Sequence, residues 1–184
     1  MVRKILFIVT AWLFFIGMQA AAPTSQEVLN QLVRNAHGGM EVHVINGVTS
    51  YSGYVGTGYM HYFYKELAYV KPEVAVKWGE YRYQDAYHVT TTSIAVPVTV
   101  GYRLFQQGGI GMNVFGGVRY EQILNSTNNN YGHDVNTTQV GLTAGTSVRL
   151  LDKFSINASY YYGLTTLFRD GSGRITSFNF SFNF

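Results

Sequence analysis

Hydrophobic and polar residues alternate along most of this chain, and the alternation is clearest at its end. From Arg174 to Phe184 the sequence reads RITSFNFSFNF, so that every second residue from Phe178 onward is a phenylalanine. A period of two places neighbouring side chains on opposite faces of a β-strand. The segment therefore predicts a strand with one aromatic face and one face of serine and asparagine.

The same period recurs through the preceding sequence and gives about eight predicted strands. Most of them reach the roughly 9–11 residues that a tilted strand needs to cross a bilayer. The predicted strands are Gly38–Ile45, Tyr54–Tyr64, Ala68–Tyr83, Thr90–Phe105, Ile110–Leu124, Gln139–Leu151, Phe154–Thr166 and Arg174–Phe184.

The links between these strands alternate in predicted length. Long outer loops and short periplasmic turns are typical of outer-membrane barrels. If the first strand starts on the periplasmic side, the outer links are Asn46–Gly53, Gln84–Val89, Asn125–Thr138 and Leu167–Gly173. The inner links are Lys65–Leu67, Gln106–Gly109 and Asp152–Lys153. The pattern predicts an all-β fold: an eight-stranded antiparallel up-and-down transmembrane β-barrel.

The last strand also resembles the terminal signal that the barrel-insertion machinery of the outer membrane reads. That signal is a final aromatic residue with apolar residues two, four and six positions before it. Here the matching residues are Phe178, Phe180, Phe182 and Phe184. The resemblance implies that the insertion machinery and outer-membrane lipid are partners of this strand. The alternative is an ordinary edge strand of a secreted β-sandwich.

Alternation alone leaves open which face is outside, because a soluble lipocalin-like barrel turns its apolar face inward. The fourth predicted strand places Ile94, Val96, Val98, Val100, Tyr102 and Leu104 on one face, and Ser93, Ala95, Pro97, Thr99, Gly101 and Arg103 on the other. Such polar faces carry few of the Lys and Glu residues usual on a strand facing bulk water, which favours an apolar face turned to lipid.

Aromatic residues near the strand ends support the same orientation. They predict girdles at the two bilayer surfaces, formed by Trp78, Tyr81, Tyr83, Tyr102, Tyr120 and Tyr160 to Tyr162. Pro72 and Pro97 oppose the strand assignment, because proline removes a ladder hydrogen bond, and we expect a β-bulge to absorb them.

The N-terminal segment has the features of a secretory signal peptide over residues 1–22. Arg3 and Lys4 precede the apolar run Ile5–Ile16, and three alanines follow at positions 20–22. A retained N-terminal anchor is the alternative. Residues 23–37 then form a lead-in to the barrel domain, which we place at residues 38–184.

The lead-in predicts a short helix over Thr24–His37. Thr24 with Glu27 forms a candidate capping box, and Gly38 with Gly39 is expected to stop the helix. One face carries Val28, Leu29, Leu32, Val33 and Ala36. Such a helix suits a periplasmic lead-in or a plug in the barrel mouth, and a partly disordered tail is the alternative.

Composition agrees with strands better than with spanning helices. Hydrophobic residues make up 47% of the chain, yet mean hydropathy is only +0.01. Charged residues amount to 12%, against roughly 25% in soluble domains. The chain has no cysteine, which excludes disulfides and thiolate metal sites. The net charge of +3 includes Arg3 and Lys4 of the signal peptide, and we expect no direct nucleic-acid binding.

The inward face of the predicted barrel carries charges of both signs. Side chains nearly fill the interior of an eight-stranded barrel, so we expect a polar network that plugs the lumen, with a narrow conduit or ligand site as the alternative. Its members are Glu41, His43, Lys71, Glu73, Lys77, Arg103, Arg119, Glu121 and Arg149.

No pattern of catalytic or cofactor-binding residues emerges. An outer-membrane enzyme needs a nucleophile, a base and an orienting group held together near its outer rim. The candidates are Ser126 and His133-Asp134, in a link rich in asparagine where nothing fixes their geometry. The other histidines lack ligand-like spacing. We therefore expect no enzyme activity, no metal and no cofactor.

Several short stretches resemble the TraO family of conjugal-transfer proteins from Bacteroidota. They are Gly39-Met40-Glu41-Val42, the aromatic strand Val74–Tyr83, Val100-Gly101-Tyr102, Gly117-Val118-Arg119-Tyr120-Glu121, the Leu150–Phe154 turn and the terminal phenylalanine strand. Several would also fit other small barrels of that phylum, such as the PorT-like group. The lead-in departs from the TraO pattern.

The resemblance implies a non-enzymatic accessory component of a conjugative transfer apparatus in the bacterial outer membrane, with other proteins of that apparatus as partners. Two functional alternatives stay open. One is a stand-alone small surface barrel for adhesion or protection that uses the Asn125–Thr138 link. The other is a small-solute pore. A soluble secreted β-barrel that binds an apolar ligand is the non-membrane alternative.

Overall fold

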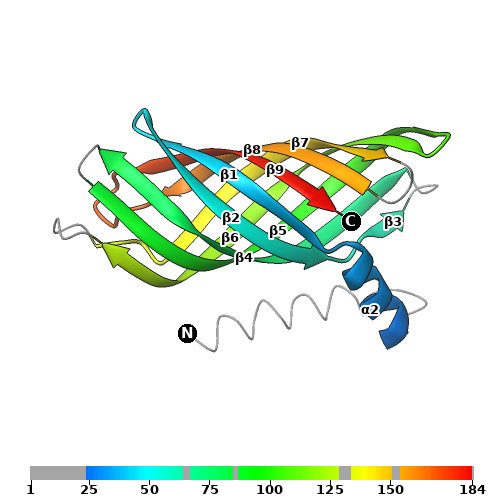
Figure 1. The fold of residues 1–184 in the computed structure, drawn as a ribbon, viewed down its shortest axis with the longest axis horizontal. Coiled ribbons are helices and arrows are strands. Elements are labelled where there is room, and N and C mark those ends of the chain that lie inside the picture. The colour runs from blue at the N-terminus through cyan, green and yellow to red at the C-terminus, as the bar shows by residue number, and fades with distance from the viewer. Residues whose placement is uncertain (1–23, 64–66, 85–86, 129–133, 151–153, 184) are drawn as a thin grey trace.

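A computed structural model describes residues 24–63, 67–84, 87–128, 134–150 and 154–183 (Figure 1). It contains one helix, α2, and a single antiparallel sheet. The elements are α2 (Ser25–Arg34), β1 (His37–Ile45), β2 (Val48–Gly58), β3 (His61–Phe63), β4 (Ala68–Gln84), β5 (Tyr87–Gln107), β6 (Ile110–Asn128), β7 (Thr138–Leu150), β8 (Phe154–Thr166) and β9 (Arg174–Asn183). The predicted signal peptide lies outside the described residues, as does Phe184.

The sheet closes on itself and forms a barrel. Strand β1 pairs with both β2 and β9, and the short β3 continues along β4 where β2 ends. When β2 and β3 are counted as one interrupted strand, the barrel has eight antiparallel strands. This confirms the predicted fold class. We call the end where β1 begins and β9 finishes the terminal end, and the opposite end the far end.

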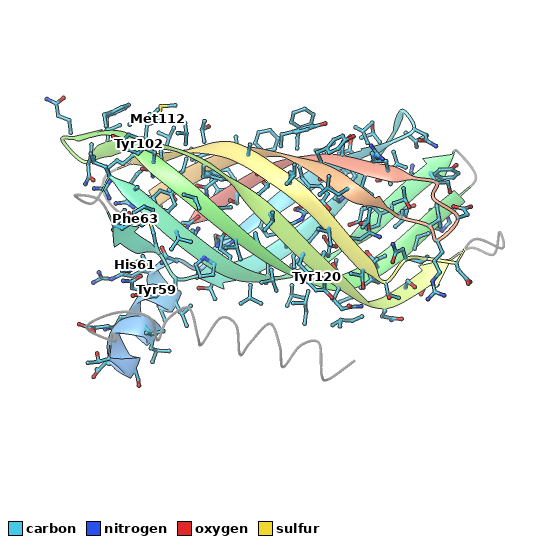
Figure 2. The ribbon with its side chains drawn as sticks, turned by 180° about the vertical axis from the view of Figure 1, so that it is seen from behind. Tyr59, His61, Phe63, Tyr102, Met112 and Tyr120 are labelled. Atoms are coloured by element: carbon cyan, nitrogen blue, oxygen red, sulfur yellow. The ribbon has the colours of Figure 1, made fainter. Side chains whose placement is uncertain are left out.

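The apolar face of the strands points outward, as predicted. In β5, Val100 and Tyr102 are 55% and 43% exposed, whereas Thr99 between Val98 and Val100 is 4% exposed. In β9, Phe178, Phe180 and Phe182 are 52%, 49% and 52% exposed. Side chains project outward from the strands in the view of Figure 2, among them the labelled Tyr102 and Tyr120. An apolar exterior this extensive requires a lipid environment.

The first hairpin corrects the predicted second strand and its preceding link. Instead of a loop over Asn46–Gly53, the chain turns at Asn46 and Gly47 alone, and β2 starts at Val48. Both turn residues have positive φ, 51° and 84°. This is the Asn-Gly pairing that a two-residue hairpin favours, because its twist matches that of the flanking strands.

The remaining outer links are also shorter than predicted, apart from residues 167–173. Strands β5 and β6 extend to Tyr87 and Asn128 at the far end, and absorb polar residues that we had assigned to loops. Beyond the bilayer both faces of a strand meet water, so the sequence there no longer alternates between apolar and polar residues. The backbone hydrogen bonds between the strands nevertheless continue. Links of two residues therefore occur at both ends of the barrel.

The two prolines are accommodated without the predicted bulge. Pro72 pairs with Val98 and Ala75 with Ala95, so β4 and β5 keep one register on both sides of the prolines. The described ladder has a gap between these two pairs, while the β5–β6 ladder continues through Pro97 and Arg119. Pro72 borders this gap and Pro97 lies within it, which confines their missing N–H groups to one place.

Helix α2 begins where predicted and ends earlier. Thr24 and Glu27 form the capping box, with the Thr24 N–H donating to Glu27 Oε2 at 2.8 Å. The helix finishes at Arg34 with Asn35 as its C-cap, and Gly38 with Gly39 belongs to β1. Within the described residues, no helix combines the length and the apolar character needed to cross a membrane.

Candidate functional site: the barrel lumen

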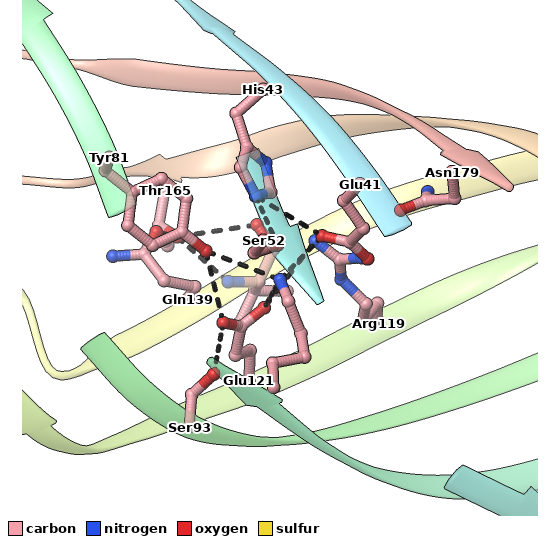
Figure 3. A network of polar contacts seen from close by, with 12 residues as sticks. Glu41, His43, Ser52, Tyr81, Ser93, Arg119, Glu121, Gln139, Thr165 and Asn179 are labelled. Carbon is pink, nitrogen blue, oxygen red and sulfur yellow. Dashed lines mark hydrogen bonds and ion pairs between the residues drawn. The ribbon is translucent and has the colours of Figure 1, made fainter. Parts of the chain in front are cut away.

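Four charged side chains from three strands meet near the middle of the lumen (Figure 3). Glu41 of β1 contacts Lys77 of β4 at 2.7 Å and Arg119 of β6 at 2.5 Å. Glu121 contacts Lys77 at 2.9 Å and Arg119 at 3.5 Å. We call these four residues the central cluster. Each is between 1% and 6% exposed, and its two positive and two negative charges balance.

Neutral residues add further contacts to the central cluster. Ser93 donates a hydrogen bond to Glu121 Oε1 at 2.7 Å, and the Tyr81 hydroxyl donates to the same oxygen at 3.3 Å. The Arg119 guanidinium stacks 3.6 Å from the centre of the Tyr161 ring. Buried charges are tolerated when they are paired and hydrogen-bonded. Each of the four charges has two ion-pair partners in the cluster, while Arg119 Nε and Glu41 Oε2 make no hydrogen bond beyond these ion pairs within the described residues.

His43 borders the central cluster on the far side. Its Nε2 lies 2.7 Å from Ser52 Oγ and 3.7 Å from Glu41 Oε2, and its ring centre is 4.6 Å from that of Tyr81. The histidine is fully buried. It therefore packs the lumen and has no access to solvent from which a substrate or a metal ion would arrive.

The other predicted lumen residues lie toward the terminal end, outside the central cluster. Lys71 and Glu73 form their own pair at 2.6 Å, with His37 3.7 Å from the same carboxylate. Arg103 stacks 4.8 Å from the centre of the Tyr62 ring. Arg149 is half-buried in the lumen wall. The single predicted network is thus divided: five of the nine residues meet at the centre, and the others do not reach it.

Two lumen residues were misassigned to the aromatic girdle. Tyr81 and Tyr161 are 2% and 1% exposed and point inward, beside Lys77 and Arg119. The alternation of the strands contained the signal, because Tyr81 lies four residues from the predicted lumen residue Lys77, and Tyr161 has the same parity as the polar β8 residues that line the cavity, namely Ser155, Asn157 and Ser159. Position near a strand end predicted the location of these two tyrosines less well than the alternation did.

An apolar cluster fills the far end of the barrel. Its buried members are Ile45, Tyr81, Val89, Tyr161, Leu167, Phe168 and Ile175. Leu167 and Phe168 come from the link between β8 and β9, and this link is held by the Leu167 N–H donating to Gly173 O at 2.8 Å. Phe168 packs edge-on against Tyr83 at 5.2 Å. We call this set the far-end cap.

The terminal half of the lumen is hollow by contrast. A cavity of about 120 Å³ extends from Asn35 and Asn183 at the terminal rim to Glu41, Lys77 and Arg119. Small polar residues of β8 and β9 form much of its wall, namely Ser155, Asn157, Ser159, Asn179, Ser181 and Asn183. A polar space of this size holds water.

Tyrosine rings inside the lumen lie on glycines of neighbouring strands. A Cβ added at Gly39 would stand 2.7 Å from the Tyr54 ring. Tyr69 covers Gly101 and Tyr161 covers Gly141 in the same way. The missing side chain at each glycine lets a large ring lie flat against the wall, which is how a narrow barrel accommodates aromatic residues.

The described residues show no catalytic or metal-binding arrangement. No group of three or more His, Asp or Glu residues among them could hold a metal ion. Asp134 is exposed and lies 3.9 Å from Arg169, Ser126 is exposed, and His133 falls outside the described residues. Those three predicted candidates are therefore not brought together by any described contact.

Comparison with known proteins gives a family match and several structural matches. A family model described as "Outer membrane protein beta-barrel domain" matches residues 14–169, while no curated protein matches the chain. The outer membrane enzyme PagL is 11% identical, with 80% of this chain and 97% of that chain covered and a TM-score of 0.57. Neisserial surface protein A has 11% identity, 80% and 92% coverage and a TM-score of 0.50.

A third structure is Ail, the attachment invasion locus protein of Yersinia pestis. It has 12% identity, 80% and 94% coverage and a TM-score of 0.47. At such identities the first two likenesses show the barrel fold and leave activity undetermined.

Proposed function

The chain belongs to the outer membrane protein β-barrel domain family, and from that premise we propose that it is a non-enzymatic, non-conducting accessory component of a conjugative transfer apparatus. Its location is the bacterial outer membrane. In this role the barrel is an anchor, and its rims and links are the surfaces that bind other envelope proteins.

The blocked lumen is the observation that carries the proposal of an anchor. The central cluster and the far-end cap occupy the lumen in succession, and both consist of buried side chains in direct contact. A pore needs a continuous hydrated path, and these two layers interrupt it, because the cavity of the terminal half ends at the central cluster. With the interior occupied in this way, the outward-facing parts of the molecule are left to perform the function.

The transfer role is supported by the stretches that resemble the TraO family. Glu41 lies in the Gly39–Val42 stretch, Lys77 in Val74–Tyr83, and Arg119 with Glu121 in Gly117–Glu121. Three separate stretches of that resemblance therefore supply all four charges of the central cluster. Residues from three stretches that are far apart in the sequence therefore contact one another in the central cluster.

A mating assay tests the transfer role. The gene is deleted from a donor strain and the frequency of plasmid or transposon transfer is compared with that of the complemented strain. We expect the deletion to lower transfer and the intact gene to restore it. Unchanged transfer in the deletion strain would refute the conjugation role while leaving the barrel assignment intact.

Bilayer recordings separate the anchor from the small-solute pore. The purified protein is inserted into planar bilayers, with a known porin as the positive control. We expect no unitary conductance steps, because the central cluster and the far-end cap block the lumen between its middle and its far end. Reproducible steps of one size would favour the pore.

A surface barrel for adhesion or protection is the second candidate. It is favoured by the extension of β6 to Asn128, which carries exposed polar residues Asn125 to Thr127 beyond the expected strand end. Such an extension would hold the following link away from the membrane. Cells that express the protein would then bind surfaces or resist serum in the absence of any transfer genes.

A further inference from the structure

Helix α2 is attached to the outside of the barrel wall. The Thr57 hydroxyl of β2 donates to the carbonyl of Leu32, and Asn35 Nδ2 donates to Gly58 O at 3.0 Å. Thr57 lies on the same outward face of β2 as Tyr51 and Val55. The last turn of α2 is therefore bound to the outer surface at the terminal end, and the helix does not plug the barrel mouth (Figure 1).

The apolar stripe of α2 is only partly covered by this attachment. Val28 and Leu32 of α2, and Ala36 just after it, are half-buried, and the Leu32 carbonyl is the group that contacts the barrel. Leu29 and Val33 are 60% and 67% exposed. A soluble helix would bury such a stripe against protein, and within the described residues nothing does so.

The exposed stripe begins where the lipid-facing surface of the barrel ends. Thr57 pairs with Val74 and Val55 with Val76, and the three valines are 52%, 44% and 43% exposed in the order Val55, Val74, Val76. Gly58, which accepts the hydrogen bond from Asn35, is the last residue of β2, so the chain after α2 is bound at the corner between β2 and β3.

We propose that α2 lies in the membrane interface at the terminal end, with Leu29 and Val33 inserted among the acyl chains of the adjoining leaflet. Continuity with the exposed valines of β2 and β4 supports lipid over a protein partner as the occupant. The helix itself carries only two charges, Glu27 and Arg34, near its opposite ends. The capping box satisfies N–H groups at the N-terminal end of α2, which lowers the cost of approaching hydrocarbon. The helix is then a lateral anchor that fixes the rotation and depth of the barrel.

Site-directed spin labelling tests this placement, and the absence of native cysteine makes single labels possible. Leu29→Cys and Val33→Cys are the test positions, and Asn30→Cys and Arg34→Cys are matched positions on the polar side of the same helix. Val55→Cys reports the lipid face of the barrel. Each labelled protein is reconstituted in vesicles of bacterial phospholipid, and its collisions with oxygen and with a water-soluble nickel chelate are measured.

We expect the ratio of oxygen to nickel accessibility at positions 29 and 33 to approach that at position 55. It should exceed the ratio at positions 30 and 34 by about threefold or more, because oxygen concentrates in the bilayer and nickel chelates stay in water. Heat-dependent migration on gels confirms that each labelled barrel is folded before it is measured.

Two results would overturn the proposal. Equal, water-like accessibility at all four helix positions would place α2 in solution. Shielding of positions 29 and 33 from both oxygen and nickel would show that protein covers the stripe, through a second copy or another chain. Neither result would affect the transfer assay, so this inference and the proposed function fail independently.

Discussion

The two halves of the lumen are built on the same strands with the same alternation, yet one is solid and the other hollow. From the central cluster to the far end, the inward positions carry large residues such as Tyr81, Tyr161 and Phe168. Toward the terminal end, β8 and β9 contribute serine and asparagine around a cavity of about 120 Å³. The small inward residues of β8 and β9 therefore leave this half of the lumen open, although Tyr54 and Tyr69 of other strands also line it.

The largest expected difference between the halves concerns two arginines. Arg119→Met removes one partner from a buried, balanced cluster and leaves Glu41 and Glu121 with a single cation, at an expected cost of about 3–5 kcal/mol in unfolding free energy. Arg149→Met is the matched change in the hollow half. There water solvates the side chain, and we expect a loss below about 1 kcal/mol.

Denaturant titration in lipid vesicles, followed by heat-dependent gel migration, measures both arginine variants. If Arg149→Met destabilised the barrel as much as Arg119→Met, the hollow half would carry an equally important buried network. The distinction between a sealed and an open half would then be wrong.

A substitution in the far-end cap is expected to cause the next largest loss of unfolding free energy. Leu167 is 0% exposed, and Leu167→Ala should cost about 2–5 kcal/mol, because the cap cannot close fully over the missing atoms. Leu164→Ala is the control, since that leucine is 51% exposed on the outer face and its place is refilled by lipid. The same titration applies, and similar midpoints for the two leucine variants would contradict a tightly packed cap.

The barrel and the direction of its faces follow from sequence because both depend on local pattern. A period of two identifies each strand, and the scarcity of Lys and Glu on the polar faces indicates that the apolar faces meet lipid. Inward placement of Glu41, Lys77, Arg119 and Glu121 follows from parity alone. The aromatic face of β9 is recognisable for the same reason.

The sequence does not predict which charged residues contact one another. Those contacts depend on the registers of all the strand pairs that lie between them in the closed sheet. Glu41 and Arg119 lie 78 residues apart along the chain, and a shift of two residues in any ladder would separate them. Lys71, Glu73 and Arg149 also point into the lumen, as the alternation predicts, but they lie nearer the terminal end of the barrel than the central cluster does. The Asn46–Gly47 turn was predictable, and it was missed because the polar residues after it were assigned to a loop.

A substitution of a glycine that lies under a tyrosine ring is expected to cause a smaller loss of unfolding free energy. A Cβ at Gly141 would overlap the Tyr161 ring, which also stacks on Arg119. We expect Gly141→Ala to cost about 1–3 kcal/mol through displacement of that ring. For Gly116→Ala the nearest atom is Thr143 O at 3.6 Å, an ordinary contact. That control should stay within about 0.5 kcal/mol of the native protein, and equal losses would show that strand glycines matter for backbone reasons alone.

The smallest expected effect on stability comes from single cysteines, which map the boundary between the halves directly. Ser159 lines the cavity, whereas Ser177 on the adjacent strand is 0% exposed. Serine and cysteine are similar in size, so both variants should fold like the native barrel. A charged thiol reagent reaches Ser159→Cys through water in the cavity and should modify it at least about tenfold faster than Ser177→Cys, because only an accessible thiolate reacts. Comparable rates would mean that water passes the central cluster, and the lumen would then be a continuous path and not a blind one.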